Sequence, residues 1–492
     1  MEQIVISKLN ESFLQISCES STERELSEHF CFYVPGYKFM PAYRNRVWDG
    51  KIRLFDYRKK QIYCGLFNYL KEFAQERGYK IITDYEPTST ENVDELISRL
   101  PLTAAGAPIH PRGYQIEGIK HALSNNKSLL LSPTASGKSL MIYLMIRHFL
   151  ESNDKQNILI VVPTTSLVEQ MYTDFGDYSS TDSWNVDNNC HRIYSGKEKI
   201  NLKHRVIITT WQSVYKMNLS WFNSYGMVIG DEAHNFKAKS LTAILEKCVN
   251  AKYRIGTTGT LDGTQTHQLV LEGLFGPVHR VTSTKSLMDA DDLAQLEIRI
   301  LLLKYADRYM RSIAKAKYQE ELDFLVGHSP RNEFITDLTV KLRGNVLVLF
   351  QYVEKHGKPL HDILKKKVAK NQKLFYVSGE TDVDTRENIR SITENENNAI
   401  IVASMGTFST GINIKKLHNI IFASPSKSQI RVLQSIGRGL RKSGDGINTI
   451  VYDIADDLHW RTQKNYTLKH AAERINIYSK EKFTYNINEI NL

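Results

Sequence analysis

A chain of 492 residues is too long for one hydrophobic core, so we expect roughly two to four domains with clefts between them. With 41% hydrophobic and 24% charged residues, its composition is that of a globular protein and excludes a disordered or fibrous chain. The 64 Lys and Arg exceed the 54 Asp and Glu, and the formal charge of +10 favours polyanionic partners, although a solvated basic surface explains the same excess.

The chain starts with MEQIVISKLN, which lacks the basic and then apolar segments of a signal peptide. No apolar run approaches the ~20 residues that cross a bilayer, so we expect a cytoplasmic protein with no membrane association. The cysteines are widely spaced and form no CxxC pair for zinc or redox chemistry. We predict buried free thiols at Cys18, Cys31, Cys64, Cys190 and Cys248.

Residues 1–100 mix aromatic and basic residues without a phosphate-binding loop, and we predict a small separate α+β domain there. Its most basic part carries Lys38, Arg44, Arg46, Lys51, Arg53, Arg58, Lys59 and Lys60, with Tyr37, Phe39, Tyr43, Trp48, Phe55 and Tyr57 between them. Cations that neutralise phosphates and rings that stack on opened bases indicate a contact with duplex or junction DNA. Alternatively, the rings form the core and the cations its solvated rim. Both hold if Trp48 and Phe55 are buried while the arginines face DNA.

From Gln115 onward, short apolar runs alternate with segments that suit helices. The runs are Leu129–Leu131, Ile158–Val162, Val206–Ile208 and Met227–Ile229. This rhythm predicts a parallel α/β sheet, whose functional loops lie at the carboxyl ends of its strands.

The segment from Leu129 to Ser139, LLLSPTASGKS, leads from the first run into an apolar helix that begins near Leu140. This is the layout of a phosphate-binding loop, in which backbone N–H groups wrap the phosphates. Lys138 would neutralise the β- and γ-phosphate oxygens, and Ser139 would be a Mg²⁺ ligand. The usual first glycine is Ser132 here, and a lone GKS tripeptide would be a chance match.

Two adjacent carboxylates, Asp231 and Glu232, follow the run Met227–Ile229. Asp231 would hold Mg²⁺ through water, and Glu232 would polarise the water that attacks the γ-phosphate. His234 would link the nucleotide site to the neighbouring domain. An acidic helix cap after a strand is the alternative, but the phosphate loop upstream favours the site.

A second set of runs predicts a second parallel sheet: Val346–Phe350, Leu374–Val377, Ala399–Val402, Ile420–Ala423 and Thr449–Tyr452. The two α/β domains would join within residues 282–293, and residues 305–342 are typical of helix. Further on, QSIGRGLR places Arg438 and Arg441 three residues apart, on one face if helical. They would act as arginine fingers on the γ-phosphate, although alone the segment suits a basic surface helix.

Together these motifs resemble those of a superfamily 2 helicase over residues 112–441. RGYQ at Arg112–Gln115 is similar to the Q motif, SPTASGKS to motif I, VVPTTSLVEQ to motif Ia and ITTWQS to motif Ic. DEAH at Asp231–His234 matches motif II, and TGT at Thr258–Thr260 matches motif III. NVLVLFQYVEKHG is similar to motif IV, ASMGTFSTGINI to motif V and QSIGRGLR to motif VI. In motif V this chain has Asn413 where the family has an acid.

The resemblance implies two tandem RecA-like domains, at 101–284 and at 285–492 with a C-terminal helical tail, after the N-terminal α+β nucleic-acid-binding domain at 1–100. It implies ATP and Mg²⁺ as cofactors. It assigns catalysis to Glu232, His234, Gln434, Arg438 and Arg441, and Mg²⁺ to Ser139 and Asp231. It assigns ATP to Arg112, Gln115 (adenine), Pro133, Thr134, Ala135, Ser136, Gly137, Lys138, Ser139, Asp231 and Gly411.

Nucleic acid would lie across both α/β domains, opposite the ATP cleft. The backbone contacts would be Thr164, Thr165, Thr210, Trp211, Ser404, Thr407, Thr410 and Gly411, with Lys38, Arg44, Arg46, Lys51 and Arg53 from the N-terminal domain. Hydroxyls and amides hold phosphates without reading bases, so tracking would be independent of sequence.

The whole chain, including GYKFMPAYRNRVWDGKIRLFDY and ERINIYSKEKFTY, resembles the recombination and replication-fork helicases of tailed phages. This implies that a monomer in the host cytoplasm unwinds Holliday junctions, stalled forks and RNA–DNA hybrids in R-loops. Three alternatives stay open: an RNA helicase, a duplex DNA translocase of a restriction or remodelling complex, and a nucleic-acid-binding protein with an inactive nucleotide site. TTWQS favours DNA, no nuclease motif supports the second, and Lys138, Asp231 and Glu232 argue against the third.

Overall fold

The computed structural model describes residues 2–86, 93–196, 203–236, 238–411, 414, 416–424, 428, 432–433, 435–437, 440 and 448–492. The chain forms two compact units. One comprises Met1–Ser132 and Gly137–Val281, and the other comprises Thr282–Leu492 together with Pro133–Ser136. Each unit contains a seven-stranded sheet.

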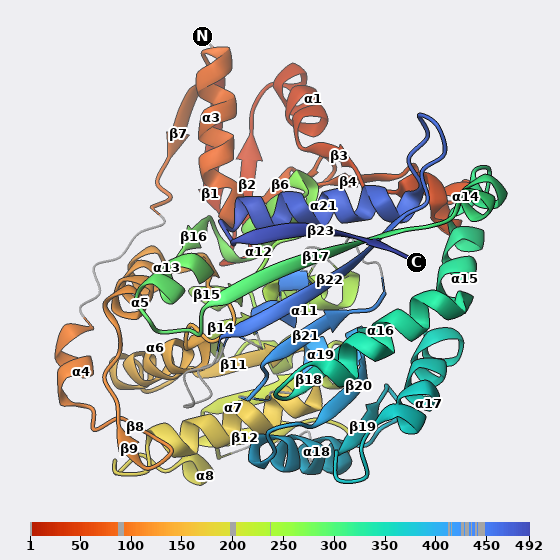
Figure 1. Cartoon of the computed structure of the whole chain (residues 1–492). Helices are drawn as coiled ribbons and strands as arrows, with labels where there is room; N and C mark the ends of the chain where they lie inside the picture. Colours follow the sequence, from red (N-terminus) through yellow and green to blue (C-terminus); the bar gives the residue numbers. More distant parts are fainter. Residues whose placement is uncertain are drawn as a thin grey trace. The chain divides into compact units, whose positions relative to one another are not determined.

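The N-terminal domain is built on a mixed five-stranded sheet of order β5-β6-β2-β1-β7 (Figure 1). Its strands are β1 (Gln3–Lys8), β2 (Phe13–Ser17), β5 (Phe55–Asp56), β6 (Gln61–Tyr63) and β7 (Lys80–Thr83). Strict alternation buries Ile4, Ile6, Leu14 and Ile16 on one face. Around it lie α1 (Ser20–His29), the pair β3 (Cys31–Tyr33) and β4 (Lys51–Arg53), η1 (Tyr37–Phe39), α2 (Pro41–Arg44), η2 (Cys64–Leu66) and α3 (Phe67–Arg77).

The first α/β domain has a parallel sheet of order β12-β13-β11-β14-β15-β10-β16. Its strands are β10 (Lys127–Leu131), β11 (Asn157–Val162), β12 (Cys190–Ile193), β13 (Val206–Thr210), β14 (Tyr225–Asp231), β15 (Tyr253–Thr258) and β16 (Val278–Arg280). Its helices are α4 (Asp94–Arg99), α5 (Gly113–Asn125), α6 (Lys138–Ser152), α7 (Thr165–Tyr178), α8 (Val186–Asn189), α9 (Trp211–Val214), α10 (Leu219–Phe222), η3 (Ala233–Asn235), α11 (Lys239–Lys247), α12 (Gln265–Phe275) and, in the other unit, α13 (Thr284–Asp289). A short hairpin pairs β8 (Thr103–Ala104) with β9 (Ala107–Pro108).

The second α/β domain repeats this design with the parallel order β19-β20-β18-β21-β22-β17-β23. Its strands are β17 (Leu296–Lys304), β18 (Val346–Phe350), β19 (Leu374–Val377), β20 (Ile400–Ser404), β21 (Asn419–Phe422), β22 (Thr449–Asp457) and β23 (Tyr485–Asn491). Its helices are α14 (Asp307–Ile313), α15 (Tyr318–Gly327), α16 (Ser329–Lys341), η4 (Val353–Gly357), α17 (Lys358–Lys367), α18 (Val383–Asn395), α19 (Met405–Gly411) and α21 (Tyr466–Lys480). The predicted fold class, two RecA-like parallel sheets after an α+β domain, is therefore confirmed.

The nine strands predicted from apolar runs are all present, within two residues at their starts. The runs missed five further strands, β12, β15, β16, β17 and β23, because polar residues interrupt them or they lie at a sheet edge. The expected C-terminal helical tail is wrong in its last part. After α21 the chain adds β23, which pairs in parallel with β17.

The N-terminal domain is not separate in its packing, because one continuous cluster of buried side chains joins it to the first α/β domain. Leu129 and Val161 on one face of the parallel sheet belong to the same cluster as Ile4 and Leu14. The opposite face packs Leu130 and Ile160 under α5, α6 and α7. The two domains therefore form one unit.

The burial of the cysteines agrees only in part with the prediction. Cys64, Cys190 and Cys248 are buried free thiols as predicted, but Cys18 and Cys31 are only partly buried because they lie in the small domain near solvent.

Within the described part of the chain, no helix combines the length and apolar character needed to span a bilayer.

Candidate functional site

The loop from Ser132 to Lys138 connects β10 to α6 and has the geometry of an anion cradle. Ala135 and Gly137 adopt left-handed φ angles of 64° and 80°, which turn successive backbone N–H groups inward. The Ser136 hydroxyl donates to the Pro133 carbonyl at 2.7 Å and braces the turn. The Lys138 ammonium donates to the Ser132 carbonyl at 3.2 Å, which holds its charge inside the loop at the start of α6. Such a loop suits the phosphates of a nucleotide.

Gln115 joins the Q motif to this loop. Its side-chain oxygen accepts the Arg112 backbone N–H at 2.8 Å and so caps the start of α5. Its side-chain nitrogen lies where a Cβ on Gly137 would be, only 2.2 Å from that ideal position. Glycine is therefore required at 137 both for the left-handed φ and for this close approach. The Arg112 guanidinium donates to the Tyr114 hydroxyl at 3.0 Å.

The two carboxylates of motif II lie at the carboxyl end of β14. Asp231 is buried, and its Oδ1 accepts from the Thr257 hydroxyl at 2.7 Å. Burial, together with the charge of Glu232, raises the pKa of Asp231. A buried carboxylate beside the Lys138 charge fits a divalent cation, which would offset the cost of burying its charge, and Ser139 supplies a hydroxyl at the start of α6.

Glu232 follows with a left-handed φ of 50°, uncommon for a residue with a side chain. This conformation ends β14 abruptly and starts η3. Glu232 is only partly buried, and its Oε2 lies 3.3 Å from Nδ1 of His234. Backbone strain of this kind gathers at functional sites, and here it exposes one carboxylate while the adjacent one stays buried.

His234 is connected inside its own domain to motif III. Its Nδ1 lies 3.0 Å from the Thr258 hydroxyl, at the end of β15. His267 on α12 supports it from behind, with Nε2 2.9 Å from the His234 carbonyl oxygen and Nδ1 2.7 Å from Asp262. The predicted link from His234 to the second α/β domain stays a prediction.

Several predicted nucleotide contacts fall outside this geometry. Gln434, Arg438 and Arg441 of motif VI lie outside the described residues. Gly411 of motif V is the last residue of α19, and the side chain of Thr410 lies outside the description. Their roles remain predictions.

The hydroxyls predicted to hold nucleic acid mostly stabilise their own turns. Thr164 caps α7 by accepting the Leu167 N–H at 3.4 Å, and the buried Thr210 hydroxyl lies 3.0 Å from that of Ser213. Thr165 is exposed at the first position of α7, and Trp211 packs partly buried beside Tyr215. On the second sheet, Ser404 donates to Thr407 at 2.7 Å, and both are buried. These side chains fix the loop shapes, so backbone amides are the more accessible donors.

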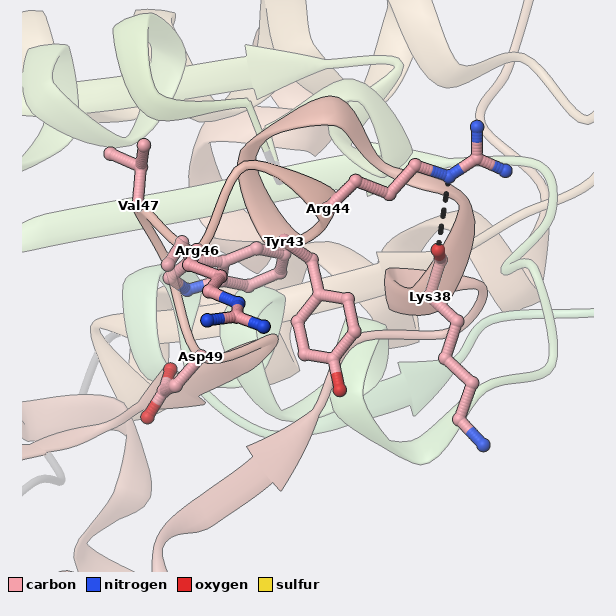
Figure 2. Close-up of a pocket in the computed structure, with 7 residues that line it drawn as sticks. Lys38, Tyr43, Arg44, Arg46, Val47 and Asp49 are labelled. Carbon is pink, nitrogen blue, oxygen red and sulfur yellow. Dashed lines mark hydrogen bonds between the residues drawn. The ribbon is translucent and has the colours of Figure 1, made fainter.

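The basic segment of the N-terminal domain projects between β3 and β4 and encloses a surface pocket of about 510 Å³. Figure 2 shows this pocket, with Arg44 donating to the Lys38 carbonyl at 3.4 Å. The lining residues are Lys38, Tyr43, Arg44, Arg46, Val47, Trp48 and Asp49. We call residues 36–50 the basic loop.

The aromatic residues in and just after the basic loop mostly lie outside the core. Phe55 is fully buried, but Phe39 is 76% exposed and Tyr57 41% exposed. Tyr37 stacks on Tyr33 and meets Tyr43 edge-on, so a small aromatic cluster supports the loop. Gly50, at φ 80°, lets the Tyr37 ring approach to 2.3 Å from an ideal Cβ position. The alternative in which the rings form the core is therefore right for Phe55 and wrong for Phe39 and Tyr57, whereas Tyr37, Tyr43 and Trp48 are partly buried.

The five predicted cations of this region differ in their partners. Arg53 forms an ion pair with Asp49 at 2.5 Å, so its charge is largely satisfied, and Lys51 lies over the Tyr33 ring. Lys38, Arg44 and Arg46 have no ion-pair partner among the described residues and are exposed. These three are the best placed to meet phosphates.

Sequence reasoning missed Thr257 and Arg254, both on β15. The signal for Thr257 was available, because parallel strands end at one edge and the register pairs Asp231 with Thr257. Arg254, 1% exposed, donates to the carbonyls of Leu245, Cys248 and Leu274 and to the Ser12 hydroxyl. No sequence pattern marks such a residue, because its partners come from three distant segments.

Family models match three consecutive parts of the chain. Residues 4–84 match "DNA helicase UvsW, N-terminal", residues 108–263 match "Type III restriction enzyme, res subunit", and residues 330–443 match "Helicase conserved C-terminal domain". The chain is 36% identical to the ATP-dependent DNA helicase uvsW of Enterobacteria phage T4, over 98% of each chain.

Two solved structures are similar over most of the chain. The crystal structure of T4 UvsW matches with a TM-score of 0.52 and 34% identity, covering 99% of each chain. The ATP-dependent Type ISP restriction-modification enzyme LlaBIII bound to DNA matches with a TM-score of 0.57 and 14% identity, over 85% of this chain and 34% of that one. The second likeness concerns the fold alone.

Proposed function

Because the chain belongs to the UvsW family of superfamily 2 helicases and is an ATP-dependent DNA helicase, we propose that its substrates are branched DNA and R-loops. The substrates would be Holliday junctions, stalled forks and RNA–DNA hybrids, processed during recombination, repair and replication. The observation that carries this proposal is the basic loop, in which three exposed cations without an ion-pair partner among the described residues lie beside the exposed Phe39 and the partly buried Tyr37 and Tyr43. Cations hold duplex phosphates, and rings stack on bases that a branch point leaves unpaired.

The attachment of the basic loop supports its use in a motor. The shared core, the Lys127–Glu11 ion pair at 2.8 Å and the Arg254 hydrogen bonds fasten the N-terminal domain to the first α/β domain. DNA held by the basic loop would therefore move with the domain that carries motifs I to III. Strand separation follows when the second α/β domain shifts its own grip in each ATP cycle.

For hydrolysis we propose distinct roles for the motif I and II residues. Backbone N–H groups of 134–137 and the Lys138 ammonium hold the phosphates, and Glu232 takes the proton of the attacking water. Mg²⁺, held by Ser139 and through water by Asp231, would neutralise the phosphate charge. Thr257 fixes the Asp231 carboxylate by its 2.7 Å hydrogen bond, and Thr258 fixes His234. Arg438 and Arg441 would complete the site from the second α/β domain.

The test is ATP-dependent processing of a panel that contains a four-way junction, a replication fork, an R-loop and an RNA duplex. We expect turnover of the first three and little of the RNA duplex. Release of a triplex-forming strand from linear duplex DNA, without processing of branched substrates, would instead mark a duplex translocase. Activity on the RNA duplex alone would contradict the proposal.

A further inference from the structure

A short hairpin extends from the carboxyl end of β22 in the second α/β domain. Trp460 and Gln463 exchange two backbone hydrogen bonds, at 3.1 and 3.0 Å, and leave Arg461 and Thr462 at the tip. Arg461 has a left-handed φ of 54°, where Gly or Asn would fit with less strain. A long cation at a strained, exposed tip points to a use for its guanidinium group.

The base of this hairpin is held rigidly. Glu321 is 2% exposed, and its carboxylate accepts from the Asn465 side chain, from the Tyr466 and Thr467 N–H groups and from the Thr467 hydroxyl. Asn465 also accepts the Leu458 N–H at 3.0 Å and donates to the Asp456 carbonyl at 3.1 Å. The buried Glu321 carboxylate, with all these hydrogen bonds, fixes the direction of the hairpin, so the tip is held in one position.

Helix α14 lies beside the hairpin, because one of its arginine side chains packs against the tryptophan of the hairpin. The Arg311 guanidinium lies 4.9 Å from the centre of the Trp460 ring. Residues 307–318 hold Arg308, Arg311, Lys315 and Lys317 against Asp307, and residues 459–469 hold Arg461, Lys464 and Lys469 with no carboxylate. Tyr318 and Tyr466, 37% and 42% exposed, meet edge-on at 5.7 Å.

This surface lies at the same end of the sheet as motifs IV and V, the end formed by the carboxyl ends of the strands. The strands β18, β20, β21, β22 and β17 are parallel, so the hairpin, α14, motif IV and motif V all start from carboxyl ends. With strands about 4.8 Å apart, and with β22 running about three residues past the level of Phe350, the ends of β18 and β22 are separated by roughly 14 Å, the length of a few nucleotides. Lys355 of motif IV also forms an ion pair with Asp323 of α15 at 2.8 Å, which connects the two areas.

We propose that the hairpin, α14 and the adjoining tyrosines form a second binding site for single-stranded DNA, in which Trp460, backed by Arg311, stacks on a base and Arg461 and Lys464 meet phosphates. The site deepens the proposed function, on which it rests. It takes the unpaired strand as it leaves motifs IV and V, and so gives the second α/β domain a grip of its own. We call it the hairpin site.

A solvated basic face explains the charge but not the aromatic residues. Lysines and arginines on such a face need no partly exposed Trp and no exposed Tyr among them, and no rigid support. An acidic protein segment would also pair with the cations, but the position of the site at the same end of the sheet as motifs IV and V favours nucleic acid. Sequence-tolerant stacking with phosphate neutralisation is the common mode of single-strand binding.

The experiment measures binding of a labelled oligothymidylate of about 16 nucleotides to the full chain over a series of salt concentrations. Trp460→Ala removes the ring, and Trp460→Phe is a conservative variant that keeps one. Arg461→Asn with Lys464→Gln removes two charges, and Asn tolerates the left-handed tip. The matched control is Lys365→Gln with Lys366→Gln, two exposed lysines at the end of α17, which leads to the amino end of β19.

We expect Trp460→Ala to weaken binding about tenfold and Trp460→Phe to restore most of it. The two-charge variant should lower the slope of log affinity against log salt by about 1.4, close to 0.7 for each lost phosphate contact. The control should change neither quantity, and all variants should keep the ATPase rate measured without DNA. Wild-type affinity and salt slope in the hairpin variants would overturn the proposal. The proposal would also be overturned if a poly-Glu peptide competed equally well with wild-type protein and Trp460→Ala, and the DNA affinity did not depend on Trp460.

These results are separable from the proposed function. If the wild type processes no branched substrate while Trp460→Ala still weakens oligothymidylate binding, the hairpin site stands and the branched-DNA proposal fails. If branched substrates are processed and the hairpin variants bind as the wild type does, only the hairpin site is overturned.

Discussion

The motif I and II site and the basic loop use polar residues in opposite ways. At the first, Asp231, Thr257 and Thr258 are buried at strand ends and hydrogen-bonded to one another or to their neighbours. In the second, Lys38, Arg44 and Arg46 are exposed cations on a loop. Hydrolysis requires reacting groups held to a fraction of an ångström, whereas tracking along a polymer requires charge that tolerates any base. The predictions below test this contrast.

The largest effect should come from Glu232→Gln, which removes the proposed base without changing the size of the side chain. We expect ATP turnover to fall by about 10²–10⁴-fold while ATP still binds, because the phosphate loop is unchanged. Turnover is measured by phosphate release and binding with a fluorescent ATP analogue. Unchanged turnover would mean that Glu232 is misassigned.

The next largest effect should come from Arg254, which fastens the N-terminal domain to the first α/β domain. Arg254→Met should lower the free energy of unfolding by about 3 kcal/mol, since it leaves the buried carbonyls of Leu245, Cys248 and Leu274 without their donor. Urea unfolding measures it. The exposed Arg280→Met on β16 is the matched control and should cost less than about 0.5 kcal/mol. An equal loss of unfolding free energy in the two variants would contradict a role of Arg254 in fastening the N-terminal domain.

A smaller effect should follow from removing the free charges of the basic loop. Lys38→Gln, Arg44→Gln and Arg46→Gln together should weaken fork binding and lower the salt slope by about 2.7, close to 0.9 per phosphate for duplex DNA. ATP turnover without DNA should stay at the wild-type rate. The exposed Lys155→Gln serves as a charge control. A salt slope like that of the wild type would exclude the basic loop from DNA binding.

The smallest effect should come from mild acid, which acts on the α/β domain that carries motifs I and II and not on the basic loop. Burial, and then the charge of His279 stacked on it at 3.8 Å, lowers the pKa of His121 to about 4. The unfolded chain, with an ordinary pKa near 6.5, therefore binds the proton first, so this stability is complete above pH 6.5 and is lost as pH falls toward 4. Because the His121 ring is partly exposed and solvent weakens the effect, we expect a contribution of less than about 2 kcal/mol. His121→Asn should flatten the pH dependence of urea unfolding between pH 6.5 and 4, and the same slope in both proteins would contradict the assignment.

The sequence predicted those parts of the molecule in which local pattern and function coincide. Apolar runs that end in the turn before Gly137 and Lys138 or in paired carboxylates marked β10 and β14, because buried parallel strands are largely apolar. Strands β17 and β23 were missed, since alternating polar residues or an exposed edge position hide them from that signal. Arg254 and Glu321 were invisible for another reason: each is charged and buried, and its hydrogen-bond partners come from other elements, from Ser12 to Leu274 for Arg254 and from residues 465–467 for Glu321.

The same distinction applies to the sites. Motifs I and II could be read because their residue types serve one chemistry at fixed spacing. In the basic loop the sequence showed the composition but not which rings are buried or that Arg53 is paired with Asp49. The hairpin site was not recognised at all, because its cations and rings come from residues 307–318 and 459–466 and meet only through the parallel sheet.

The central claim, that ATP hydrolysis at motifs I and II is coupled to branched DNA, is tested most directly by steady-state ATP hydrolysis with and without a four-way DNA junction. Wild-type protein should hydrolyse ATP several-fold faster with the junction than alone or with an RNA duplex, and the basic-loop triple variant should need more junction to reach the same rate. A hydrolysis rate that is the same with the junction, with RNA and with neither would contradict the account.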